Sequence, residues 1–103
     1  MVSIIYSTFD RVQNAEEVAR VLLDERLVAC VNIIPGCRSL YRWRGRIEEA
    51  EECVLIGKTI DKKVDEAVRR IKKLHPYETP DIIVLPVTAG LKEYITYVED
   101  ETS

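Results

Sequence analysis

The sequence predicts a single α+β domain over residues 1–103, with a ferredoxin-like β-α-β-β-α-β sandwich order and a short C-terminal helix. Runs of apolar and β-branched residues alternate with two stretches whose apolar residues recur at helical spacing. The composition, 47% hydrophobic and 32% charged, is that of a globular chain, and 103 residues are enough for one core. No linker, low-complexity tract or second domain is evident.

The first half of this order is a strand followed by an amphipathic helix. Val2 to Ser7 is a short apolar run that predicts a strand. Asn14 followed by Glu17 resembles a capping box, so we expect the helix to begin there. Its predicted apolar face consists of Ala15, Val18, Ala19, Leu22 and Leu23.

A long hairpin is predicted in the middle of the chain. Its first strand starts at Val28 and is interrupted by a bulge or kink at Pro35-Gly36. It resumes through Trp43, turns at Arg44-Gly45 and returns as a strand that ends at Thr59.

A second helix and a fourth strand complete the order. Asp61 is a candidate N-cap, and Pro76 should end the helix. The strand is predicted over residues 82–87, and a short helix follows Gly90. The predicted apolar face of the second helix consists of Val64, Ala67, Val68, Ile71 and Leu74.

The apolar pattern of the strands predicts self-association. In this architecture both main helices cover one face of the sheet, so the strands should alternate apolar and polar residues. Instead, pairs and runs such as Ile4-Ile5, Ile33-Ile34 and residues 82–85 place apolar groups on both faces. A bare face of this kind exceeds what soluble monomers usually expose, so we expect a second copy to cover it.

Charge and cysteine content exclude several classes of protein. The net charge of −3 gives no reason to expect binding to nucleic acid or to an anionic membrane surface. No apolar run is long enough to span a membrane, and we expect a cytoplasmic protein. Three cysteines, an odd number, argue against a secreted disulfide framework, and the absence of a C-x-x-C pair argues against a zinc knuckle or a thioredoxin-like redox site.

The arms of the hairpin carry opposite charges. The outgoing arm holds arginines beside Tyr41 and Trp43, a mixture that can stack on RNA bases. The returning arm holds as many glutamates, so we expect cross-strand neutralisation instead, with Arg38 near Glu51 or Glu52 and Arg42 near Glu48. The same register brings Cys37 within about one residue of Cys53, where an occasional disulfide would be compatible with the spacing.

Residues 75–80, with the sequence HPYETP, form a stiff corner that holds the only histidine. His75 and Glu78 could ligate a divalent cation, although one histidine needs help from cysteine, carboxylate or another subunit. The alternative is a helix stop whose polar groups only hydrogen-bond the turn. No nucleophile elbow or phosphate-binding glycine loop is present, so we do not expect an enzyme.

Several ordered motifs closely resemble the CutA divalent-cation tolerance family. They are residues 26–36 (RLVACVNIIPG), residues 39–45 (SLYRWRG), Lys58-Thr59 and the HPYETP segment. The resemblance covers essentially the whole chain. It implies a ferredoxin-like protomer in a tight homotrimer, similar in plan to the PII signalling proteins.

The resemblance also implies a role in metal-ion homeostasis, with copper(II) or another divalent cation as the bound ion and no organic cofactor. In copper-binding bacterial members the implied ligands are a first-strand cysteine and two adjacent histidines. Ser7 and Leu74 replace two of these here, and His75 remains. Serine and leucine cannot replace thiolate and imidazole toward a soft ion.

The leading hypothesis is therefore a non-enzymatic trimer that binds divalent ions or a small ligand in clefts between its subunits. The expected lining is His75, Tyr77, Glu78, Tyr41, Trp43 and Lys58, with His75 and Glu78 as metal ligands. A PII-like regulator that senses a small molecule or a partner protein is the first alternative. A scaffold whose hairpin docks a partner is the second.

Overall fold

The computed structural model describes residues 1–103 as one antiparallel sheet with three α-helices. The sheet has four strands in the order β2-β3-β1-β4, as expected for two interleaved βαβ units. The predicted α+β class and element order are confirmed. The elements are β1 (Val2–Phe9), α1 (Val12–Asp24), β2 (Cys30–Trp43), β3 (Arg46–Ile60), a 3-10 turn (Asp61–Lys63), α2 (Val64–Leu74), β4 (Ile82–Pro86) and α3 (Lys92–Glu101).

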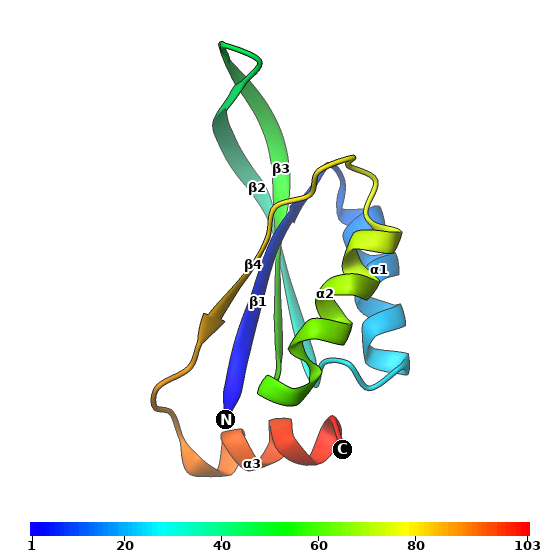
Figure 1. The fold of residues 1–103 in the computed structure, drawn as a ribbon, viewed down its shortest axis with the longest axis vertical. Helices are drawn as coiled ribbons and strands as arrows, with labels where there is room; N and C mark the ends of the chain where they lie inside the picture. Colours follow the sequence, from blue (N-terminus) through cyan, green and yellow to red (C-terminus); the bar gives the residue numbers. More distant parts are fainter.

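Helices α1 and α2 pack side by side on one face of the sheet (Figure 1). The core between them and the strands is made by Phe9 and Ile5 of β1, Leu22 of α1, Leu55 of β3 and Ile71 of α2, all fully buried. Fully burying side chains of this size stabilises a fold by roughly 1.5–3 kcal/mol each, so this layer supplies much of the folding free energy.

Strands β2 and β3 continue beyond the helices as a two-stranded arm (Figure 1). Their register shifts between Ile34 and Cys37, where Gly36 has a φ of 76°, so the predicted interruption is confirmed as a bulge. At the tip, Arg44 and Gly45 have φ values of 48° and 80°. Positive φ at both central residues is the geometry of a type I′ hairpin turn, as predicted.

The register along the arm differs from the prediction by one residue for Arg42. Arg42 lies opposite Ile47, whereas we expected Glu48. Arg38 lies opposite Glu51 as expected, but its guanidinium pairs diagonally with Glu49. Both partners are exposed, so this ion pair contributes at most ~1 kcal/mol to folding.

All three cysteines are free thiols. Cys37 lies opposite Glu52, one position from Cys53, as the sequence predicted. Successive residues of a strand point to opposite faces. Cys53 is therefore buried in the core beneath the helices, while Cys37 lies on the other face, and the protomer holds no disulfide between them.

The second face of the sheet is only partly covered. Helix α3 closes one end of it, where Val98 packs with Val2 and Ala29 in a small second cluster. Farther along this face, Ile83 is 56% exposed and Leu85 is 47% exposed. These exposed apolar side chains at successive positions on one face of β4 agree with the pattern on which self-association was predicted.

Both predicted helix caps are wrong. Helix α1 begins at Val12, and the Asn14 side chain donates a hydrogen bond to Asp10 from within the first turn. Asp61 accepts a 2.6 Å hydrogen bond from the Ser3 hydroxyl instead of capping α2. Two residues at the ends of the predicted apolar faces, Leu23 and Leu74, are exposed.

The turn geometry predicts a specific effect of substitution at Gly45. A valine Cβ would meet no atom there, but the left-handed backbone costs a non-glycine residue roughly 1–2 kcal/mol. Gly45→Val should therefore speed amide hydrogen exchange in the arm, residues 38–51, by about tenfold or more. Gly45→Asn is the matched control, because asparagine tolerates positive φ and should stay near wild type. Equal exchange in the two variants would contradict the assigned turn.

Candidate functional site

The segment between α2 and β4 runs past the base of the hairpin arm (Figure 1). It starts at His75, which ends α2 by turning from helical to extended backbone while its N–H still donates to the Ile71 carbonyl. Pro76 follows and prevents the helix from continuing, as predicted. The stiff corner therefore brings an imidazole, a phenol and a carboxylate next to β1 and the arm.

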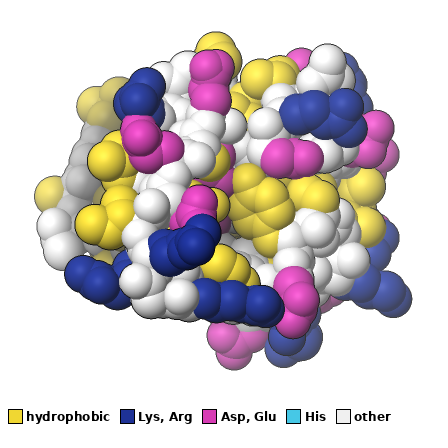
Figure 2. Space-filling view, turned by 90° about the horizontal axis from the view of Figure 1, so that it is seen from above, with side chains coloured by type: hydrophobic (Ala, Val, Ile, Leu, Met, Phe, Trp, Pro, Cys, Tyr) yellow, Lys and Arg dark blue, Asp and Glu magenta, His cyan; other side chains and the backbone are white.

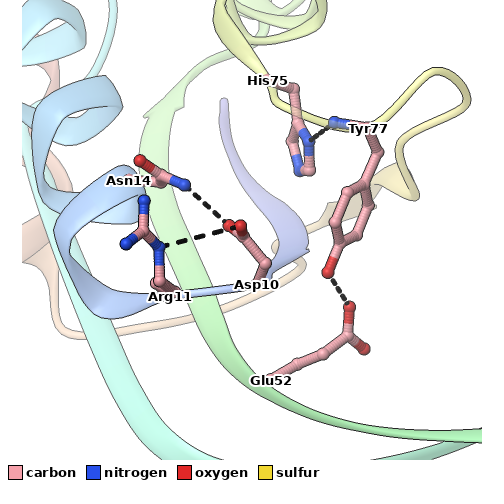
Figure 3. A network of polar contacts seen from close by, with 6 residues as sticks. All are labelled: Asp10, Arg11, Asn14, Glu52, His75 and Tyr77. Carbon is pink, nitrogen blue, oxygen red and sulfur yellow. Dashed lines mark hydrogen bonds and ion pairs between the residues drawn. The ribbon is translucent and has the colours of Figure 1, made fainter.

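His75 is buried, with only 8% of its surface exposed. Its ring stacks on Phe9 with a centroid separation of 4.0 Å and an interplanar angle of 23°. One nitrogen, Nδ1, accepts the Tyr77 backbone N–H at 3.2 Å (Figure 3). The proton must then be on Nε2, which donates to the Thr8 carbonyl at 2.8 Å. Burial lowers the pKa of His75, which favours this neutral form.

Tyr77 extends from the corner toward the hairpin arm. Its hydroxyl donates a 2.5 Å hydrogen bond to Glu52 on β3 (Figure 3). Burial, followed by this contact with a carboxylate, raises the pKa of Tyr77 far above its usual value, so the phenol keeps its proton. On the other side, Asp81 accepts hydrogen bonds from the Thr8 hydroxyl and backbone N–H.

A cleft of about 740 Å³ lies where this corner meets the arm. Its walls combine aromatic rings, carboxylates and one arginine, and Figure 2, which looks down on the arm, shows apolar and charged side chains mixed over this end. The aromatic and charged residues of its lining are Tyr6, Tyr41, Trp43, Tyr77, Arg38, Glu52, Glu78 and Asp81.

The structure brings four of the six predicted site residues to this cleft: Tyr41, Trp43, Tyr77 and Glu78. His75 lies behind the wall, where it supports Tyr77 without lining the cleft. Lys58 lies on the same second face of the sheet as the cleft, but outside its lining and closer to α3. Its ammonium is 3.9 Å from the Cys30 sulfur and 5.5 Å from the centre of the Tyr94 ring.

The arrangement does not complete a metal site within one protomer. No group of three or more His, Cys, Asp and Glu side chains is placed to hold a metal ion. Both nitrogens of His75 are occupied by hydrogen bonds, and the replaced positions offer only the buried hydroxyl of Ser7 and the exposed side chain of Leu74. A copper site of the thiolate and imidazole type does not fit these residues.

Comparison with known proteins identifies the family. The family model described as CutA1 divalent ion tolerance protein matches residues 3–101. A divalent-cation tolerance protein CutA from Thermus thermophilus is 38% identical over 102 residues, which cover 99% of each chain. This chain belongs to the CutA1 divalent ion tolerance family. The relatives are named for tolerance and not for an enzymatic activity.

Solved structures of the family share the whole fold. CutA from Xylella fastidiosa is 43% identical, has a TM-score of 0.96 and covers 99% of this chain and 98% of its own. A CutA structure from Archaeoglobus fulgidus reaches a TM-score of 0.97 at 38% identity, with full coverage of both chains. The Archaeoglobus protein is described as periplasmic, so the cytoplasmic location of this chain stays a prediction. No helix of the present chain is long and apolar enough to cross a membrane.

Sequence reasoning missed the residues that shape the cleft from other elements. Thr8, Glu52 and Asp81 were not predicted as site residues. Each nevertheless forms a hydrogen bond with the corner or with a residue next to it. The signal for Glu52 was the hairpin register, which places it beside Cys37 and on the face opposite the core. Nothing local marked Thr8, whose partners are distant in the sequence.

The buried imidazole predicts a pH dependence of stability. A histidine whose pKa is lowered on folding binds its proton mainly in the unfolded state, so its stabilisation is complete above about pH 6.5 and is lost as the pH falls below it. Between pH 7 and 5 the unfolding free energy of wild type should fall more steeply than that of His75→Gln, by up to ~1.4 kcal/mol per pH unit.

Urea denaturation at stepped pH measures this difference. His75 is the only histidine, so no other imidazole contributes to the slope. Identical slopes in the two proteins would contradict the buried neutral imidazole.

Proposed function

We propose that this protein serves divalent-cation tolerance as a homotrimer whose clefts, each completed by a neighbouring subunit, bind a divalent cation. The observation that carries the proposal is the cleft between the corner and the arm, in a chain of the CutA1 family; its lining includes Glu52, Glu78 and Asp81, which within one protomer are not placed to hold an ion together. Carboxylate oxygens are the usual ligands of hard divalent ions.

The trimer is supported by the uncovered face of the sheet. Ile83 and Leu85 of β4 and Ile34 of β2 are exposed large apolar side chains on strands that flank β1 and β3. A second copy that covered them would remove this apolar surface from water, which stabilises the assembly by roughly 25 cal/mol per Å² buried. The hairpin arm is long enough to project past the body of its own protomer, which makes it available to a neighbour (Figure 1).

Glu78 is the proposed metal ligand in this arrangement. Its side chain is exposed in the cleft, whereas Glu52 and Asp81 already accept hydrogen bonds from Tyr77 and Thr8. His75, which the sequence suggested as a ligand, acts in this proposal as a positioning residue that holds Tyr77. A neighbouring subunit supplies the remaining ligands, since one protomer has too few.

A PII-like sensor of a small molecule is the second candidate. It is favoured by the aromatic character of the same cleft, because rings such as Tyr41 and Trp43 contribute little to holding a hydrated metal ion. Cavities of about 300–1,000 Å³ with aromatic walls and a few polar groups are typical of small-molecule sites, and this cleft of 740 Å³ lies in that range.

The proposed assembly predicts the effect of a charge on the uncovered face. Ile83→Glu would place a carboxylate in the interface, and a desolvated unpaired charge costs several kcal/mol. We expect native mass spectrometry to show a trimer for wild type and mainly monomer for Ile83→Glu at micromolar concentration. Leu23→Glu is the control. Leu23 is exposed on α1, which covers the opposite face of the sheet, so this substitution should leave the trimer intact. A wild-type monomer, or a trimeric Ile83→Glu, would contradict the assembly.

The proposed ligand predicts loss of metal binding in Glu78→Gln. Copper(II), zinc(II) and magnesium should each be added to the assembled protein and bound ions counted by native mass spectrometry, with affinity from isothermal titration. Wild type should take up ions in multiples of three, and Glu78→Gln should weaken the affinity by about tenfold, the effect of ~1.4 kcal/mol. The control is Glu16→Gln, an exposed carboxylate on α1 away from the cleft. A trimer that stays metal-free would refute the metal proposal.

A further inference from the structure

We propose that the cleft between the corner and the hairpin arm, which extends along the arm to Trp43 near its tip, binds an organic ammonium ion, with carboxylates neutralising its charge and aromatic rings packing against its alkyl groups. The inference rests on the proposed use of this cleft as a binding site. It does not depend on a bound metal, and the two are tested separately below.

The first support is the charge of the lining. Glu52, Glu78 and Asp81 contribute three carboxylates, and Arg38 is the only basic residue among the lining residues. The Arg38 guanidinium pairs with Glu49, which is not among the lining residues. The two lining carboxylates that have protein partners are bonded to neutral donors, the Tyr77 phenol and the hydroxyl and backbone N–H of Thr8. With three carboxylates and one guanidinium the lining carries net negative charge, and neither of the hydrogen-bonded carboxylates has a basic partner.

The pKa values of neighbouring groups are consistent with this negative field. Burial raises the pKa of Tyr6, and the negative charges of Asp81 and Glu52 raise it further. The same carboxylates act on Tyr77 beyond the effect of burial and of its hydrogen bond to Glu52. An anionic or phosphorylated ligand would meet repulsion in such a cleft, whereas a cation is attracted.

The second support is the aromatic surface. Tyr6, Tyr41, Trp43 and Tyr77 all line the cleft. Aromatic faces attract cations through the ring quadrupole, by ~0.5–1 kcal/mol at exposed sites and ~2 kcal/mol or more where water is excluded. Trp43 already has such a contact with a protein cation, because the Arg44 guanidinium lies 5.4 Å from its ring centre. The position of Tyr77 is fixed by its bond to Glu52, so a ring and a carboxylate are presented together.

The size of the cleft and the weak hydration of alkylammonium groups favour this ligand class. A cleft of about 740 Å³ is far larger than a single metal ion requires, and it matches a small organic molecule. An alkylammonium ion carries a positive charge and apolar surface on one molecule. It is therefore complementary to a lining that combines carboxylates with aromatic rings. A neutral apolar ligand would leave the carboxylates unpaired as it displaced water from them.

Trp43 provides a direct test, because it is the only tryptophan in the chain and lines the cleft. The assembled full-length protein is titrated with tetramethylammonium in the presence of EDTA, and Trp43 fluorescence is followed. Neopentyl alcohol, similar in shape and uncharged, is the matched probe. We expect saturable quenching by the cation, with a Kd about tenfold or more below that of the alcohol.

Variants separate the contribution of the carboxylates from that of the aromatic rings. Glu52→Gln should weaken tetramethylammonium binding by about tenfold or more, while Glu16→Gln on α1 should not change it. Trp43→Leu, followed by isothermal titration, should weaken binding more than Trp43→Phe, which keeps an aromatic face. If Glu52→Gln unfolds, Glu78→Gln tests the same charge from the exposed corner.

Two results would overturn the inference. Equal affinity for the cation and the alcohol would show a merely apolar pocket. Absence of binding, with Trp43 fluorescence in wild type already shielded from acrylamide, would show that a neighbouring subunit fills the cleft. Uptake of metal ions by the same sample after removal of EDTA would leave the proposed tolerance function standing in either case, so the two failures are distinguishable.

Discussion

The hydrogen bonds of the His75 imidazole hold together the segments on which the candidate site depends. One ring nitrogen donates to the Thr8 carbonyl of β1, and the other accepts the Tyr77 N–H of the corner. An imidazolium cannot accept a hydrogen bond, so this arrangement requires the neutral ring. With the imidazole in place, Tyr77 reaches Glu52 on the arm. A single buried side chain thus sets the corner relative to both the sheet and the hairpin.

The order of helices and strands could be predicted because each element buries one face against a shared core. Apolar residues therefore recur in the sequence at the spacing of a helix or of a strand. The spacing of Ala15, Val18 and Leu22 is the spacing of buried side chains in α1. The caps could not be predicted in the same way. Asp61 has the residue type of an N-cap, but its carboxylate binds Ser3, 58 positions away. A local pattern contains no information about such a tertiary competitor.

The location of the candidate site was predictable, but its geometry was not. Proline content marked the corner, and the turn residues Arg44-Gly45 set the hairpin register that carries Tyr41 and Trp43 to the same region. Residue type could not show that both nitrogens of His75 are used by the backbone. Within one protomer Lys58 lies beside Cys30 and Tyr94 of α3, outside the lining of the cleft, so its place in an intersubunit cleft stays a prediction.

The uncovered sheet face and the acidic cleft are physically linked in the proposed trimer. Ile83 and Leu85 are exposed on the face that also carries the cleft residue Tyr6, so a second copy that covered them would also exclude water near the cleft and lower the local dielectric. Lower dielectric strengthens the attraction between a cation and the lining carboxylates, but it also raises the cost of leaving them unpaired. Assembly of the proposed trimer would therefore increase cation affinity, and a bound cation would offset the desolvation that opposes assembly. By linkage, each process would then favour the other, so the proposed cleft and the proposed interface would act as one thermodynamic unit.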